Sequence, residues 1–141
     1  MSQSVPLCWL AVIFATLVCC GCGNDLPYEF VPVSGRVTYE DGTPLPAEGG
    51  LRLAFYSDAP PVDGKYQPRA GSAFPDAEGN FSDAMTRRVG DGLIAGTHHV
   101  TVWYMGRDTR GIIPDDYTLK GKTPIVVDTA QQPFEIKVPR P

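Results

Sequence analysis

All four cysteines of this 141-residue chain lie within its first 22 residues, at Cys8, Cys19, Cys20 and Cys22. The part that follows has no disulfide framework to stabilise it, so the packing of apolar side chains has to hold its fold together. About 120 residues remain after residue 21, which is enough for one domain with a single core.

Residues 6–22 read PLCWLAVIFATLVCCGC and are followed by the polar residues Gly23, Asn24 and Asp25. An apolar run of about 10 to 14 residues is too short for a stable membrane-spanning helix and is typical of a signal peptide. A cysteine cluster at the end of such a leader resembles a bacterial lipobox, in which one cysteine is diacylated and becomes the first residue of the mature protein. Residues 1–21 are therefore expected to be a lipoprotein signal peptide, although residues 1–5 contain no lysine or arginine.

Two cysteines compete as the lipid attachment site. Cys22 is preceded by the preferred Gly21, whereas Cys20 has Leu17 three positions before it but the bulkier Cys19 directly before it. We favour Cys22 and keep Cys20 as the alternative. Two acyl chains would anchor the protein stably, so we expect it at the cell envelope, attached to a membrane after export. The alternative interpretations of residues 1–21 are an ordinary cleaved signal peptide and an uncleaved membrane anchor.

The rest of the chain is acidic and rich in turn-forming residues. The formal net charge is −4, and lysines and arginines are scattered singly, which argues against a nucleic-acid partner because such a surface needs a concentrated basic patch. The chain has 15 glycines and 14 prolines, which is usual for short strands joined by many turns.

Period-two alternation and runs of β-branched and aromatic residues predict strands in seven segments, with no convincing helix. Apolar residues at alternate positions place Leu51, Leu53 and Phe55 inward, and likewise Phe134, Ile136 and Val138. The seven segments are residues 33–39, 51–55, 72–74, 80–82, 98–105, 125–127 and 134–138. Long loops are expected over residues 57–71 and 107–122. The pattern is that of an all-β, seven-stranded β-sandwich.

Four motifs occur in order along this region: VSGRVTYEDGTPL at 33–45, EGNF at 78–81, GTHHVTV at 96–102 and IPDDY at 113–117. Together they resemble the carboxypeptidase regulatory-like domains, over roughly residues 33–138. The resemblance implies a Greek-key, transthyretin-like β-sandwich over residues 33–139, preceded by a lipidated cysteine and spacer at 22–32. His98 stands where the family usually has tyrosine. The resemblance further implies an accessory or structural module.

Few residues suggest chemistry. His98 and His99 are adjacent on an expected strand and point to opposite faces, so they cannot bind one metal ion together. Asp76, Glu78 and Asn80 are spaced like calcium ligands but lack a downstream bidentate glutamate, so a β-turn is the better interpretation. Asp115 and Asp116 could act in a hydrolase only with a partner carboxyl across a cleft. No nucleophile elbow, P-loop or dinucleotide fingerprint is present, so we expect no enzyme and no cofactor or metal.

Binding is the remaining class of function. Trp103 lies in the outward register of the strand at 98–105, either exposed or beneath the loop at 107–122. We expect a non-enzymatic structural or protein-interaction module, with an envelope protein as partner and the membrane contacted through the lipid. The alternative is a carbohydrate-binding module that holds a polysaccharide on Trp103, Tyr66 and Tyr117, because exposed aromatic rings supply rigid contact area. The oligomeric state is left open.

Overall fold

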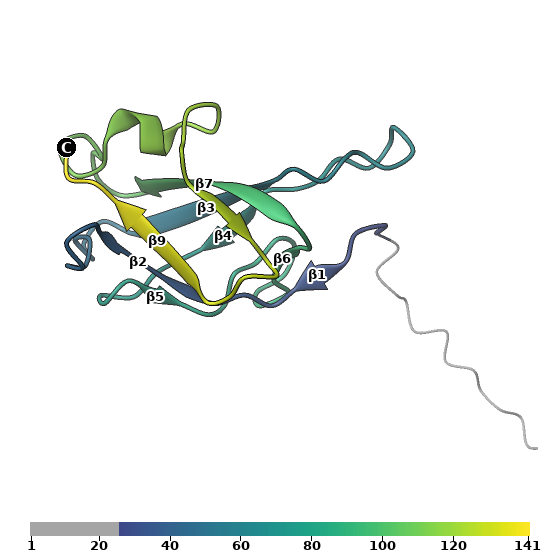
Figure 1. The fold of residues 1–141 in the computed structure, drawn as a ribbon, viewed down its shortest axis with the longest axis horizontal. Coiled ribbons are helices and arrows are strands. Elements are labelled where there is room, and N and C mark those ends of the chain that lie inside the picture. Colours follow the sequence, from purple (N-terminus) through teal and green to yellow (C-terminus); the bar gives the residue numbers. More distant parts are fainter. Residues whose placement is uncertain (1–25) are drawn as a thin grey trace, which may run out of the picture.

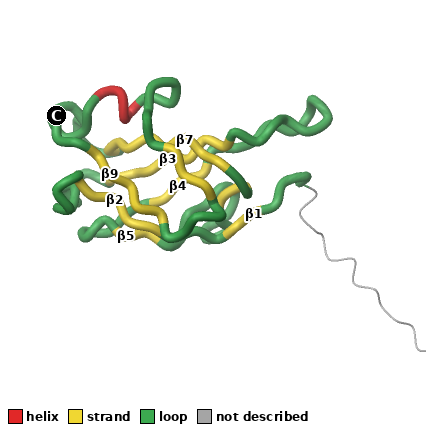
Figure 2. The backbone as a smooth tube through the Cα atoms, viewed as in Figure 1, coloured by secondary structure: helices red, strands yellow, loops and turns green. Residues whose placement is uncertain are grey.

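The computed structural model describes residues 26–141, and strands make up nearly all of its regular structure (Figure 2). The expected all-β class is confirmed for this part of the chain. The elements are β1 (Phe30–Val31), β2 (Gly35–Tyr39), β3 (Leu51–Ser57), β4 (Gly71–Ala73), β5 (Asn80–Phe81), β6 (Leu93–Ile94), β7 (Thr97–Tyr104), the 3-10 helix η1 (Asp115–Thr118), β8 (Val126–Asp128) and β9 (Phe134–Val138).

The strands form two main sheets and one small one. One main sheet has the order β4-β3-β7-β8, the other has the order β5-β2-β9, and β1 pairs with β6. Strands β2 and β9 are parallel, with Val37 opposite Ile136, whereas the other paired strands are antiparallel. The longest pairing joins β3 to β7 and places Leu53 opposite Val102.

The core lies between the two main sheets. Inward-facing residues on β3 and β9 alternate as expected, and Leu53, Phe55, Ile136 and Val138 are all at most 1% exposed. The Phe55 ring centre lies 6.0 Å from that of Phe81 on β5 and 6.1 Å from that of Phe134 on β9. Rings from both sheets therefore meet in the interior, an arrangement compatible with the expected β-sandwich.

Each of the seven segments expected to form strands overlaps an observed strand, but β1 and β6 were not expected. Phe30 and Val31 pair with Ile94 and Leu93, so part of the expected spacer at 22–32 belongs to the folded structure. A two-residue strand is too short to show a period-two pattern, which explains why the sequence did not reveal it.

Two long connections shape the ends of the molecule. Residues 58–70, which we call the arm, project from the ends of β3 and β4, on the side where β1 lies and away from the C-terminus (Figure 1). The Tyr28 hydroxyl lies 3.0 Å from the carbonyl oxygens of both Pro60 and Tyr66, so the segment before β1 packs against the arm. The other connection, residues 107–122, contains η1 and buries Ile113 in the core.

Candidate functional site

The predicted binding residue Trp103 lies on β7 and is half-buried. The guanidinium carbon of Arg52, from the neighbouring strand β3, lies 5.0 Å from the centre of its ring. Arg52 also donates hydrogen bonds to the Ser72 hydroxyl at 2.7 and 3.2 Å. One face of the tryptophan ring is thus occupied by a neighbouring side chain of the same sheet.

The two predicted tyrosines lie in different parts of the fold. Tyr117 is in η1, half-buried and packed against the core, whereas Tyr66 is in the arm. Figure 1 separates η1 from the tip of the arm along the long axis of the molecule. Tyr66 and Tyr117 therefore do not combine into one aromatic platform.

His98 and His99 point to opposite faces of β7, as expected. His98 is 1% exposed, its Nδ1 lies 3.2 Å from the Gly96 carbonyl oxygen, and its ring meets that of Phe55 edge-on. Burial lowers the pKa of His98, because the interior disfavours the charged imidazolium. The folded structure therefore favours the neutral form of His98, which is a core residue.

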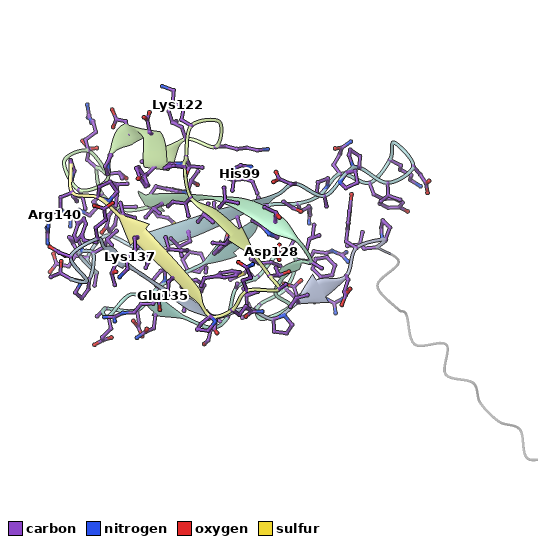
Figure 3. The ribbon with its side chains drawn as sticks, viewed as in Figure 1. His99, Lys122, Asp128, Glu135, Lys137 and Arg140 are labelled. Carbon is purple, nitrogen blue, oxygen red and sulfur yellow. The ribbon has the colours of Figure 1, made fainter. Side chains whose placement is uncertain are left out.

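His99 lines a surface hollow of about 400 Å³ between β3, β7 and residues 120–123, and its Nε2 lies 3.3 Å from an Asp58 carboxylate oxygen (Figure 3). The serine and threonine hydroxyls at this hollow bind the backbone instead. Ser57 accepts from the Ala59 N–H, and Thr123 donates to the Val100 carbonyl. In the described structure neither hydroxyl is hydrogen-bonded to His99, so the nucleophile–base contact of a hydrolase is not formed.

The acidic candidates are engaged in local structure. The Asp76 carboxylate accepts hydrogen bonds from the backbone N–H groups of Glu78 and Asn80. Its carbonyl accepts from the Gly79 N–H, which makes this segment a β-turn, as interpreted. Asp115 and Asp116 open η1, and Asp116 lies 3.8 Å from the Lys122 ammonium group. Over residues 26–141, no three histidine, cysteine or acidic side chains gather closely enough to hold a metal ion. No helix in that range is long and apolar enough to cross a membrane.

A second hollow, of about 320 Å³, lies where the segment before β1 meets the arm and the chain between β5 and β6. We call it the arm hollow. Three aromatic and three cationic side chains line it: Tyr28, Phe30, Tyr66, Lys65, Arg69 and Arg87. No carboxylate is among its described lining residues, although the protein as a whole is acidic. This combination suits an anionic group that carries an apolar attachment.

A cation–aromatic contact and local hydrogen bonds stabilise the walls of the arm hollow. The Lys65 ammonium group lies 5.4 Å from the Tyr66 ring centre, and the Asp91 carboxylate accepts from the backbone N–H groups of Thr86, Arg87 and Arg88. Of its six aromatic and cationic residues, only Tyr66 was a candidate from the sequence. The others come from three separated segments, so their charges look scattered along the chain.

Comparison with known proteins gave no match to a family model, to a curated protein or to a solved structure. The resemblance to carboxypeptidase regulatory-like domains therefore stays a prediction. The expected lipid attachment sites, Cys22 and Cys20, lie outside the described residues.

Proposed function

We propose that this chain is an exported bacterial lipoprotein, anchored to a membrane of the cell envelope through Cys22. Its β domain acts as a non-enzymatic structural or protein-interaction module. The observation that carries the proposal is the apolar leader ending in Cys19, Cys20 and Cys22, followed almost at once by a folded β domain. Leu26, the first described residue, is only the fourth residue after Cys22.

We extend the proposal to the topology, as a Greek-key, transthyretin-like β-sandwich. The chain passes repeatedly between the two main sheets: β2, β5 and β9 belong to one, and β3, β4, β7 and β8 to the other. Neighbours in each sheet are consequently often distant in sequence, as β2 and β9 are, which supports crossing connections of the Greek-key kind.

For protein interaction, the edge formed by β8 and β9 is the best-supported surface. The Phe134 N–H donates a hydrogen bond to the Ser34 carbonyl, and the Val138 carbonyl accepts one from the Glu40 N–H, both on the side of β2. The backbone groups of Glu135 and Lys137 therefore face the open side of β9. Val126 on β8 is 53% exposed beside a hollow that reaches Glu135. Figure 3 shows Glu135 and Lys137 along this edge. A partner strand could add here by main-chain pairing.

The carbohydrate-binding alternative has weaker support. A sugar ring stacks on an accessible aromatic face, and Arg52 already covers one face of Trp103. Tyr66 and Tyr117, the other two residues of that hypothesis, lie on separate elements. We therefore prefer the tethered interaction module.

Intact mass and membrane partitioning of the protein expressed in a bacterial host test the proposal. Wild type is compared with Cys22→Ser and Cys20→Ser. We expect the wild-type mass to include a diacylglycerol group, and we expect Cys22→Ser, but not Cys20→Ser, to lose both this group and the membrane fraction. A soluble, unlipidated wild-type protein would sink the proposal. Loss of lipid in Cys20→Ser alone would move the anchor to Cys20.

A further inference from the structure

The described part of the chain begins at Leu26, which lines the arm hollow. Tyr28 is hydrogen-bonded to the arm, and Phe30 pairs with Ile94 in the small sheet. These contacts fix the segment before β1 next to the hollow. A stretch of four residues spans at most about 14 Å when fully extended. If Cys22 carries the lipid, as proposed above, the arm hollow lies within about that distance of the membrane surface.

The lining of the arm hollow matches an anionic lipid surface. Lys65, Arg69 and Arg87 are exposed cations, whereas the whole chain carries a net charge of −4. Arg69 makes no hydrogen bond or ion pair within residues 26–141. Each lysine or arginine near such a surface increases attachment about fivefold. Half-buried tyrosines are also suited to the headgroup region, because their rings combine an apolar body with a polar hydroxyl.

Four acidic residues lie near the hollow, but none of them is in its lining. Asp58, at the base of the arm, lies 3.3 Å from the His99 ring, and the Asp91 carboxylate accepts hydrogen bonds from three backbone N–H groups. Asp63 at the tip and Glu29 before β1 are exposed, but neither lines the hollow. The hollow itself therefore presents cationic and aromatic groups without a carboxylate.

We propose that the arm hollow is a membrane-contact site that binds the headgroups of anionic phospholipids. This inference rests on the proposed lipid anchor and adds an orientation to it. The arm and β1 face the membrane, and the C-terminus and the loop at residues 40–50 point away (Figure 1). Arg140 near the C-terminus pairs with Asp41, which places that loop and the C-terminus together. The β8–β9 edge then stays accessible to a partner.

The test uses the purified lipoprotein in vesicles. All natural cysteines lie at or before residue 22, so a new cysteine in the domain can be labelled selectively, with Cys22→Ser added if Cys20 proves to be the anchor. A polarity-sensitive fluorophore is attached at Gln67→Cys, in the lining of the hollow, or at Ala47→Cys, in the distant loop. Vesicles contain phosphatidylcholine alone or together with phosphatidylglycerol, and spin-labelled lipid serves as the quencher.

We expect the spin-labelled lipid to quench the fluorophore at position 67 strongly in vesicles that contain phosphatidylglycerol. The quenching should become weak when the salt concentration of the same vesicles is raised. The fluorophore at position 47 should stay unquenched. The double variant Lys65→Glu/Arg69→Glu should lower the ratio of docked to undocked molecules by about 30-fold or more. Lys120→Glu/Lys122→Glu changes the net charge equally at another site and should dock as the wild type does. Equal quenching at positions 67 and 47, or no effect of the Lys65/Arg69 variant, would overturn the inference while leaving the lipid anchor in place.

If intact mass shows no lipid on the wild-type chain, the proposed function fails, and the hollow is tested separately. The purified chain is then sedimented with the same two kinds of vesicle. Salt-sensitive binding to phosphatidylglycerol vesicles that the Lys65/Arg69 variant loses would support the hollow as a lipid site. Equal sedimentation with both kinds of vesicle would refute it.

Discussion

Arg52 on β3 and Trp103 on β7 lie directly opposite each other in the antiparallel pair, with the guanidinium carbon 5.0 Å from the indole ring centre. The same guanidinium group donates to Ser72 on β4, which pairs with β3. One arginine side chain thus links three adjacent strands on the outer face of the sheet. Its planar group covers the tryptophan while its hydrogen bonds fix its position.

Replacing Arg52 by alanine should uncover Trp103. We expect the tryptophan emission to shift to longer wavelength and the free energy of unfolding to fall by about 1 kcal/mol, because a cation–aromatic contact at a half-exposed site is worth about that much. Trp103 is the only tryptophan after the leader, so the emission of the mature protein reports this residue alone. Arg110→Ala, which removes an exposed arginine paired with Asp108, is the matched control. An unchanged emission spectrum in Arg52→Ala would show that the stacking does not persist in solution.

Phe55 joins the two main sheets, and its replacement by alanine should be among the most destabilising changes. Its ring is 0% exposed and lies within about 6 Å of the rings of Phe81 and Phe134. Truncation leaves a cavity between the sheets, for which a loss of about 3 to 5 kcal/mol is typical. The neighbouring Tyr56→Ala, on the other face of β3, should cost much less. Urea unfolding measures the loss of stability in both variants. Equal losses in Phe55→Ala and Tyr56→Ala would contradict the assignment of these residues to opposite faces of β3.

The alternation of apolar residues made most of the fold predictable. In β3, β7 and β9 every second side chain enters one core, so the periodicity of two marks the strand and its core face. Ala54 and Thr101, on the opposite face of β3 and β7, are buried as well. The assignment failed at β1 and β6, where two residues leave no period to detect. These strands form because Phe30 and Ile94 become neighbours in the folded chain, a relationship between residues distant in sequence.

The candidate site was less predictable for the same reason. Alternation correctly placed Trp103 on the outer face, but the presence of Arg52 above it depends on the register between β3 and β7, which the sequence alone does not determine. The arm hollow is a stronger example, since Tyr28, Lys65 and Arg87 belong to different segments. Local sequence cannot show that such residues share one surface.

Gly79 and Gly42 provide a matched pair for testing the turn between β4 and β5. Both have positive φ, +87° and +84° respectively. A Cβ atom at Gly79 would lie 2.1 Å from the Val37 carbonyl oxygen, whereas nothing lies within 4 Å of one at Gly42. Gly42→Ala should cost about 1 kcal/mol for the left-handed conformation alone. Gly79→Ala must also displace backbone and should cost about 3 kcal/mol or more. Stability is measured by thermal or urea unfolding. If the two variants lose similar amounts of stability, the backbone around Gly79 and Val37 can move apart at no cost in free energy.

The burial of His98 predicts that the fold weakens in mild acid. Burial lowers the pKa of His98 and outweighs its hydrogen bond to Gly96 and the nearby carboxylates of Asp58 and Asp128. Between that lowered value and the ordinary 6.5, the unfolded chain binds a proton that the folded chain does not, so stability should fall as pH drops from about 7 to about 5. Urea unfolding at several pH values measures this slope, which is at most that of one proton. His98→Gln should be less stable at neutral pH yet lose the slope, whereas His99→Gln should keep it. A slope that survives in His98→Gln would assign the proton to another group.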